Sequence, residues 1–497
     1  MSPPEAPETR IDSGSVRGLW RGASAAFLGI PFAEAPVGPL RFAAPVPVQP
    51  WDGVRPADRH GATPLRRASS LTTLVPEPFI PGESTLNVDV FTPAPADPGA
   101  ALPVLVYIHG GGYTGGSPAS PWYDGLAFNR DGVVTVNVSY RLGFDGFGWI
   151  RDAPSNRGVR DWLLALDWVQ RNIRAFGGDP GRVTIAGQSA GGGAVLTLLA
   201  MTKARGLFSR AWSISGAPTD VLAERAEAIA TRLAADVGVT PDRDGFASLD
   251  ELRILDLQGK AGSETAGGRL AALRSLLSAG TWSAPPVDGE LIEAPIVEAI
   301  EAGAGADIPL VIGSADDEIS GILRGEAKTL DRVPAGLALT VLGARGTRRR
   351  RDYLRANAAI RGRGTAALLG RYASDMAFRA NVLRIARARE AASAPTWVYR
   401  FEWPSPVSGF AQHCLDLPFF FDCLAAEQVA AVAGTDAPQG LADAVHGAAI
   451  AFCAAGDPGW PSWSAQPGTA RAFGGQNAID PAAYESVAPL VAPHAPR

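Results

Sequence analysis

The chain has 497 residues, of which 46% are hydrophobic and 19% are charged. This balance is typical of a soluble globular protein that is large enough to bury a substantial core. The formal net charge of −5 gives no reason to expect nucleic acid or an anionic membrane surface as a partner. In addition, no apolar run approaches the ~20 residues that a membrane-spanning helix requires.

The cysteines indicate a reducing compartment. Cys414, Cys423 and Cys453 are too few, and too late in the chain, to form a disulfide framework. The N-terminal segment MSPPEAPETR has no apolar core and no cleavage-type signal. We therefore expect a cytoplasmic protein.

The first half of the chain alternates apolar runs with a helical pattern. Residues 104–108 and 133–138 are continuous apolar runs, which is typical of strands buried on both faces. Apolar residues between 159 and 173 recur at spacings of three and four and predict a helix, which the segment 176–180, FGGDP, ends. A third apolar run follows at 183–186. Strand, helix and strand in this order predict a parallel sheet with right-handed crossovers.

The second half is predicted to be mostly helical. Further strands are expected at 211–214, 308–312 and 397–401. Helical patterns fill much of the region from about 219 to 392, including 222–237 and 366–391. We therefore predict an α/β fold with a central, mostly parallel sheet flanked by helices. We expect one domain over 1–497, a helical cap inserted within 219–392, and a loosely ordered tail after Ala482.

A serine stands at the junction of the 183–186 strand and a helix of small residues. The segment Gly187-Gln188-Ser189-Ala190-Gly191 has the pattern G-x-S-x-G of a nucleophile elbow. A turn of this kind exposes the serine hydroxyl beside the positive N-terminus of the helix. The pattern alone is a weak signal, because the chain has 57 glycines.

A serine nucleophile needs a base, and elimination favours His413. It lies in the segment 412–419, QHCLDLPF, shortly after the last predicted strand. The remaining histidines lie in a polar segment, a glycine run, a small-residue helix and the C-terminal tail; they are His60, His109, His446 and His494.

The run His109-Gly110-Gly111-Gly112 directly follows the 104–108 strand. Glycines at this place let the N–H groups of Gly111 and Gly112 face a substrate carbonyl without obstruction by side chains. Together with the N–H of Ala190 they would form an oxyanion hole with three donors. A merely flexible loop would not explain why the glycines follow a strand.

Three consecutive carboxylates, Asp316, Asp317 and Glu318, follow the 308–312 strand. The acid that orients the base should lie between the serine and the histidine in the chain. One of the three could do this while the others cap a helix or face water. Their spacing alone does not choose among them.

The ordered series of motifs resembles the type B carboxylesterases, which include bacterial para-nitrobenzyl esterases and animal cholinesterases. The similarity covers about residues 12–465. The matching segments are FLGIPFAEAPVGPLRF at 27–42, YRLG at 140–143, AFGGDP at 175–180, GQSAGG at 187–192, VDG at 287–289 and HCLDLPF at 413–419.

The resemblance implies an α/β-hydrolase fold and hydrolysis of small carboxylic esters through an acyl-enzyme, without a metal or organic cofactor. It identifies Glu318, five residues after Gly313, as the acid of a triad with Ser189 and His413. It further implies that Ser215 supports this triad by a hydrogen bond.

Three positions depart from the family pattern. Thr85 replaces the cysteine of the SEDCL motif, so the N-terminal disulfide loop of secreted members is absent. Gln188 stands where cholinesterases carry glutamate, and the loss of that carboxylate makes a cationic substrate less favourable. Trp162 replaces the usual glutamine after Asp161.

Two alternative functions are compatible with the same fold. The triad would also suit the hydrolysis of carbamates or aryl amides, which a comparison of matched esters and amides would distinguish. A non-catalytic member with an adhesion role would lack the nucleophile or the base, whereas Ser189, Glu318 and His413 all occupy matching positions.

Overall fold

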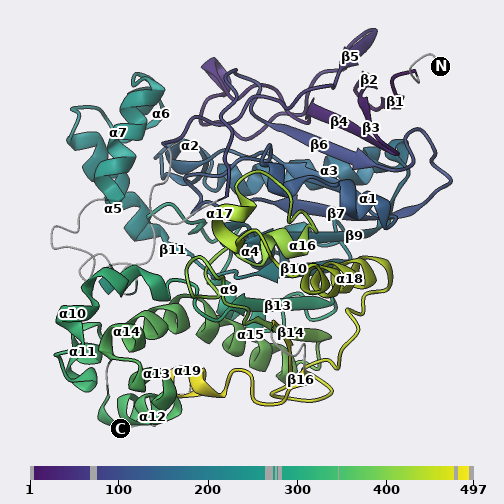
Figure 1. The fold of residues 1–497 in the computed structure, drawn as a ribbon. Coiled ribbons are helices and arrows are strands. Elements are labelled where there is room, and N and C mark those ends of the chain that lie inside the picture. Colours follow the sequence, from purple (N-terminus) through teal and green to yellow (C-terminus); the bar gives the residue numbers. More distant parts are fainter. Residues whose placement is uncertain are drawn as a thin grey trace.

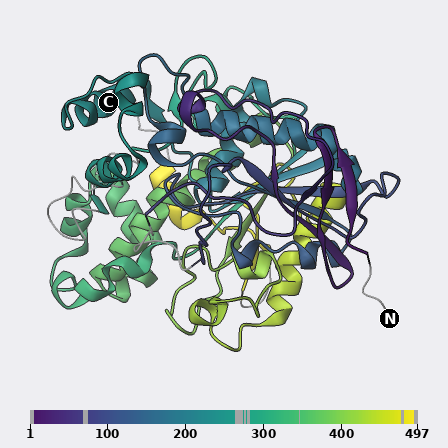
Figure 2. The same ribbon diagram turned by 90° about the horizontal axis from the view of Figure 1, so that it is seen from above.

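The computed structural model describes residues 5–67, 75–262, 273–274, 277, 282–344, 346–474 and 479–491. Its centre is an eleven-stranded sheet in the order β16-β15-β14-β13-β10-β9-β7-β8-β6-β4-β3. Figure 1 shows the N-terminal strands at one end of this sheet and the C-terminal strands at the other. Helices lie on both sides of the strands (Figure 2). The predicted α/β class is confirmed.

Seven neighbouring strands in the middle of the sheet are parallel. They are β7 (Leu102–Ile108), β8 (Val134–Val138), β9 (Gly178–Gln188), β10 (Arg210–Ile214), β13 (Leu310–Ala315), β14 (Thr396–Phe401) and β15 (Ala470–Phe473). All predicted strands overlap with members of this set. β8 and β9 lie on either side of β7, so the helix between them crosses over one strand.

The edges of the sheet are antiparallel. The edge strands are β3 (Leu19–Arg21), β4 (Ser24–Pro31) and β6 (Asn87–Thr92) beside β8, and β16 (Ile479–Asp480) beside β15. Two small sheets lie apart from it, formed by β1 (Glu8–Ile11), β2 (Gly14–Arg17) and β5 (Val54–Pro56), and by β11 (Val221–Leu222) and β12 (Pro286–Val287).

Helices connect the strands and extend two of the connections. Before β10 these are α1 (Leu126–Arg130), α2 (Gly143–Phe147), α3 (Arg157–Asn172) and α4 (Ala190–Ala200). Between β10 and β13 lie α5 (Ala223–Ala235), α6 (Arg243–Ala247), α7 (Glu251–Gly262) and α9 (Ile296–Glu301). Between β13 and β14 lie α10 (Ala327–Leu330), α11 (Ala335–Val341), α12 (Thr347–Ala356), α13 (Ala358–Gly362), α14 (Thr365–Ser374) and α15 (Ala380–Ala391). The last helices are α16 (Leu417–Phe420), α17 (Val429–Ala433), α18 (Gln439–Ala455) and α19 (Ala488–Val491).

The helix expected over 366–391 contains a change of helical type. α14 and α15 are joined by a π-helical turn, Asp375–Arg379. Inside this turn the Asp375 carboxylate accepts hydrogen bonds from Arg379 at 2.6 Å and from the Tyr353 hydroxyl at 2.7 Å. A π turn inserts one extra residue into a helix and is frequent at functional sites.

The prediction of a loosely ordered tail after Ala482 is wrong as far as residue 491. A 3-10 turn, Glu485–Val487, and α19 follow Tyr484, which is buried. The Tyr484 hydroxyl donates to the Tyr399 carbonyl at 2.8 Å and lies 3.1 Å from Ser314 Oγ. The contacts of Tyr484 therefore order a segment whose composition predicts disorder. Residues 492–497 lie outside the described residues.

A buried ion pair fixes the first turns of α3 to Arg141. Asp161 on α3 is fully buried and accepts from Arg141 Nε at 2.9 Å, from Nη2 at 2.6 Å and from the Arg141 N–H at 3.0 Å. Arg157 is also fully buried, and burial together with the nearby Arg141 lowers the pKa of its guanidinium to about 9. Asp161 therefore balances Arg141 at a site that holds a second buried arginine.

Replacement of Asp161 by alanine should destabilise the fold strongly, because it leaves buried positive charge without its partner. Loss of one member of a buried pair costs about 3–5 kcal/mol. With the usual unfolding entropy per residue, this corresponds to a fall of about 3–5 °C in the melting temperature of a chain of this size. Differential scanning fluorimetry measures it.

The matched control is Asp167→Ala on the same helix. Asp167 pairs with Arg171 at 3.0 Å, and both side chains are largely exposed. Exposed pairs contribute about 0–1 kcal/mol, so this variant should melt within about 1 °C of the unmodified protein. Equal melting temperatures for the two variants would contradict the role given to Asp161.

Candidate active site

Ser189 lies in a strained turn between β9 and α4. Its φ of 59° and ψ of −121° fall in a region that L-residues rarely adopt. The turn is held at both peptides, since the Ser189 N–H donates to the Ile214 carbonyl at 2.9 Å and its carbonyl accepts from the Gly193 N–H at 2.9 Å. A Cβ at position 191 would lie 2.0 Å from the Ile108 carbonyl oxygen, so that site requires glycine. The geometry is that of a nucleophile elbow.

The glycine run after β7 lies directly beside this serine. A Cβ on Gly110 would lie 2.6 Å from the Gln188 carbonyl oxygen and 3.2 Å from Ser189 Cβ. In the part of the chain that the structure describes, the N–H groups of Gly111, Gly112 and Ala190 have no hydrogen-bond acceptor, and their use in binding an oxyanion stays a prediction.

The His109 imidazole orients the first of these N–H groups, which the sequence analysis did not foresee. Burial lowers the pKa of His109 to about 4, so the ring is neutral. Its Nδ1 lies 2.8 Å from the Gly110 carbonyl oxygen, and the ring stacks on Tyr140. In a trans peptide the N–H points opposite to the carbonyl, so this bond turns the Gly111 N–H away from the imidazole.

Glu318 is the carboxylate that reaches His413. Its Oε2 forms a short hydrogen bond with His413 Nδ1, while Oε1 accepts the Ala315 N–H at 2.8 Å. The His413 N–H also donates to the Glu318 carbonyl at 3.0 Å. The contact selects one acid from the three that spacing left open.

The two neighbouring carboxylates are paired elsewhere. Asp316 accepts from Arg400 at 2.7 and 2.8 Å, and Asp317 accepts from Arg371 at 3.0 Å. Burial raises the pKa of Asp316, but the opposite effect of Arg379, Arg400 and Arg371 is larger and lowers this pKa to about 2. These groups are structural ions and are not candidates for the acid.

His413 faces a side-chain amide on its other side. Its Nε2 lies 3.2 Å from Nε2 of Gln188. In the neutral ring, with the Nδ1 proton directed at Glu318, Nε2 is the acceptor and the Gln188 amide donates to its single lone pair. Among the described residues this lone pair is therefore occupied by Gln188 and not by the Ser189 hydroxyl. Burial lowers the pKa of His413, but Cys414 and Glu318 raise it more, so that it lies well above the ordinary value.

Two side chains at this site were missed by the sequence analysis. The Phe378 ring, from the π turn, lies 4.9 Å from the His413 ring and is only half-buried. Asp416, three residues after His413 in the chain, is buried and accepts from the Tyr399 hydroxyl at 3.3 Å. Phe378 carries no sequence signal because its spacing fits the core of a helix, whereas Asp416 belongs to the 413–419 motif.

Ser215 follows β10 and is fully buried. Its hydroxyl has no hydrogen-bond partner among the residues that the structure describes. The hydrogen bond to the triad that the resemblance implies is therefore not formed among the described residues.

The other histidines have structural partners. His60 Nδ1 lies 2.8 Å from Asp89, and His446 lies 2.8 Å from the Phe420 carbonyl and 3.1 Å from Asp131. His494 lies outside the described residues. Elimination therefore led to the histidine that contacts Glu318.

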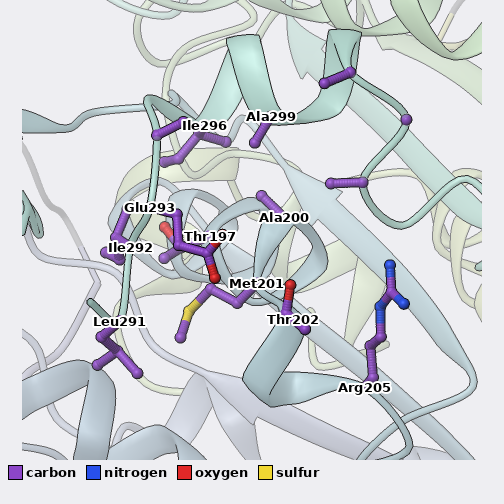
Figure 3. A pocket seen from close by; sticks show the side chains of 14 residues that line it. Thr197, Ala200, Met201, Thr202, Arg205, Leu291, Ile292, Glu293, Ile296 and Ala299 are labelled. Carbon is purple, nitrogen blue, oxygen red and sulfur yellow. The ribbon is translucent and has the colours of Figure 1, made fainter. Parts of the chain in front are cut away.

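A separate cavity of about 330 Å³ lies at the opposite end of α4 (Figure 3). Its wall includes Met201, Leu291, Ile292 and Ile296, with Arg205 at its margin. The wall begins at Thr197, about 12 Å along α4 from Ser189. It therefore does not adjoin the serine.

The described residues contain no group of three or more histidine, cysteine, aspartate or glutamate side chains placed to hold a metal ion. Nor do they contain a helix that is both long and apolar enough to cross a membrane.

Comparison with known proteins gives a consistent result. The profile of the carboxylesterase family matches residues 5–470. The chain is 32% identical to the para-nitrobenzyl esterase of Bacillus subtilis, with 90% of this chain and 91% of that protein covered. It is also 32% identical to the fumonisin B1 esterase of Sphingopyxis macrogoltabida, over 93% and 86%. The solved structure of carboxylesterase EST55 from Geobacillus stearothermophilus superposes with a TM-score of 0.81 at 31% identity, covering 95% and 97%. The chain therefore belongs to the carboxylesterase family.

Proposed function

We propose that Ser189, His413 and Glu318 are the nucleophile, base and acid of this carboxylic ester hydrolase. The observation that carries the proposal is the Glu318–His413 hydrogen bond beside a serine in a strained elbow. Gly111, Gly112 and Ala190 supply the oxyanion hole. All of these groups follow the carboxyl ends of neighbouring parallel strands, where α/β sheets bind their ligands.

The reaction proceeds through an acyl-enzyme. The Gln188 amide first leaves the single lone pair of His413 Nε2. Nε2 then takes the proton of the Ser189 hydroxyl as its oxygen attacks the ester carbonyl carbon, and Glu318 stabilises the imidazolium that forms. The three N–H groups bind the oxyanion, and each contributes about 3 kcal/mol to lowering the barrier. The alcohol leaves with the proton from His413, and water then attacks the acyl carbon with His413 again as base.

Gln188 adapts this site to neutral esters. Its amide donates to His413 Nε2 and places no negative charge beside the substrate. A carboxylate here would attract a cationic alcohol group and would also stabilise the imidazolium before the reaction. We therefore assign uncharged small esters as substrates and consider choline esters poor ones.

Asp416 is a second carboxyl group close to the triad. Burial and the nearby Glu318 raise its pKa to about 7, against the smaller opposing effect of His413. The group is therefore mostly uncharged below about pH 7 and adds no second negative charge to the Glu318–His413 pair in that range.

The setting of the site is proposed from two further features. The helices inserted between β10 and β14 form a cap on a single catalytic domain. The three cysteines are free, and Thr85 occupies the position of the family's disulfide cysteine, which supports a reducing, cytoplasmic location.

Labelling of Ser189 tests the proposal. A fluorophosphonate probe should label the protein, and Ser189→Ala should abolish labelling and lower kcat on a para-nitrophenyl ester by at least about 10⁴-fold, because the nucleophile is lost. The matched control is Ser215→Ala at the end of the next strand, which should still be labelled. Labelling of Ser189→Ala at the rate of the unmodified protein would remove this serine from the mechanism.

The pH profile should report His413. Its neutral form is the base and its pKa is raised, so kcat/KM should increase with pH through an apparent pKa above 6.5. Gln188→Glu should move this limb upward by about 1–2 pH units, because the new carboxylate favours the imidazolium. Steady-state kinetics from pH 5 to pH 10 measure both. The exposed substitution Gln466→Glu is the control, and an unshifted limb in Gln188→Glu would contradict the placement of that side chain.

Asp416→Asn should change the pH dependence of stability. A carboxyl group whose pKa is raised on folding, here from about 4 to about 7, makes the folded state progressively less stable as pH rises through that range. Asparagine removes this effect. The free energy of unfolding of Asp416→Asn, relative to that of the unmodified protein, should therefore increase by about 2–3 kcal/mol from pH 5 to pH 8. Melting temperatures at both values measure it, with exposed Asp436→Asn as the control. A difference independent of pH would contradict the raised pKa.

A further inference from the structure

The turn that carries the proposed oxyanion donors is folded onto itself. The Gly111 carbonyl accepts the N–H groups of Thr114 at 3.1 Å and Gly115 at 2.9 Å. Because the Gly112 N–H belongs to the same trans peptide as this carbonyl, it points out of the turn. The positions of residues 114–116 therefore determine the direction of an oxyanion donor.

The end of this turn also contacts its beginning. A Cβ on Gly116 would lie 2.1 Å from the Gly110 carbonyl oxygen and 2.2 Å from His109 Nδ1. The Gly116 backbone thus packs against the hydrogen bond that orients the Gly111 N–H. A displacement of Gly116 would disturb both proposed glycine donors.

A carboxylate from outside the turn holds Gly116 in place. The Gly116 N–H donates to Glu77 Oε2 at 3.0 Å, and a Cβ on Gly115 would lie 3.4 Å from the same oxygen. Next to this contact, Ser117 Oγ donates to the Pro78 carbonyl at 2.9 Å. A backbone N–H bound to a carboxylate forms a stronger hydrogen bond than one bound to a neutral acceptor.

Arg66 balances the charge of this carboxylate. Its Nε lies 3.6 Å from Glu77 Oε2, and the two side chains are 3% and 14% exposed. Its Nη2 donates to the carbonyls of Glu77 and Pro78, each at 2.9 Å, and its Nη1 donates to Pro64 at 3.1 Å. The guanidinium therefore fixes the segment that carries Glu77. It also offsets a negative charge that would otherwise oppose an oxyanion nearby.

We propose that Glu77 is a positioning residue for the oxyanion-binding turn, with Arg66 as its counterion. The inference rests on the proposed function of the Gly111 and Gly112 N–H groups. Glu77 does not touch the substrate. It acts by fixing Gly116, and through it the distance between the donors and the developing oxyanion, on which such catalysis depends steeply.

Three substitutions separate the reach of this side chain from its charge. Glu77→Gln keeps an acceptor oxygen at the same distance from the Gly116 N–H. Glu77→Asp keeps the negative charge but moves it away by one methylene group, and Glu77→Ala removes both the acceptor and the charge. We expect Gln to retain kcat within about threefold of the unmodified protein. Asp and Ala should each lower kcat by about 10- to 100-fold while KM changes by less than about twofold.

A transition-state analogue gives the decisive readout. An aryl trifluoromethyl ketone adds to the serine and places its oxyanion in the hole. Its inhibition constant should increase in the Asp and Ala variants by the same factor by which kcat/KM falls. The matched control is Glu83→Ala, an exposed carboxylate in the same segment, which should behave as the unmodified protein. Melting temperatures identify any variant that does not fold. If Glu77→Ala does not fold, the comparison of Glu77→Asp with Glu77→Gln decides the question.

The inference is overturned if Asp retains kcat while Gln loses it, since charge and not position would then matter. It is equally overturned if kcat falls while the affinity for the ketone is unchanged, or if all three variants match the unmodified protein. These outcomes are distinct from failure of the proposed triad, which would appear as activity and labelling retained in Ser189→Ala.

Discussion

The parallel pairing of β7, β9, β10, β13 and β14, in this order across the sheet, is the constraint on which the site depends. Parallel strands end at the same edge of a sheet, so the segments that follow them meet there. The glycine turn follows β7, Ser189 follows β9, Glu318 follows β13 and His413 follows β14. Residues separated by more than 200 positions in the chain therefore meet at this edge, although each lies in the loop that directly follows its own strand.

This convergence requires the chain to be very tightly packed at the edge. Ser189 adopts a positive φ because its peptide groups are already bound to Ile214 and Gly193. The space around it is limited by the backbone of the neighbouring connection, where Gly110 comes within contact distance. The strain in the elbow is thus maintained by hydrogen bonds of the surrounding sheet, which persist without the substrate.

The parts that the sequence predicts are those governed by local patterns. Continuous apolar runs located the central strands, and the elbow and the glycine run each carry a short pattern with a mechanical reason. The acid was different, because three adjacent carboxylates have the same local sequence environment. Their partners, Arg400, Arg371 and His413, come from distant parts of the chain, so only the family resemblance or the fold could separate them.

The misses have the same physical origin. Tyr484 anchors a tail of unfavourable composition through bonds to Ser314 and Tyr399, which no local pattern records. Phe378 reaches His413 because a π turn rotates it away from the face that regular helical spacing would give it. Both effects depend on contacts between residues that are far apart in the chain, and local secondary-structure propensity does not predict such contacts.

The buried charges near the sheet edge divide into two kinds, and this division explains the chemistry of the site. Asp316 and Asp161 each face an arginine, so their charges are balanced permanently. Glu318 faces a histidine, whose positive charge exists only when the ring is protonated. The carboxylate is therefore incompletely balanced while His413 is neutral, and becomes balanced when the ring takes a proton from the proposed nucleophile. A permanent cation in place of His413 would satisfy Glu318 equally well in the resting protein and would leave no electrostatic gain for the step in which the proton moves.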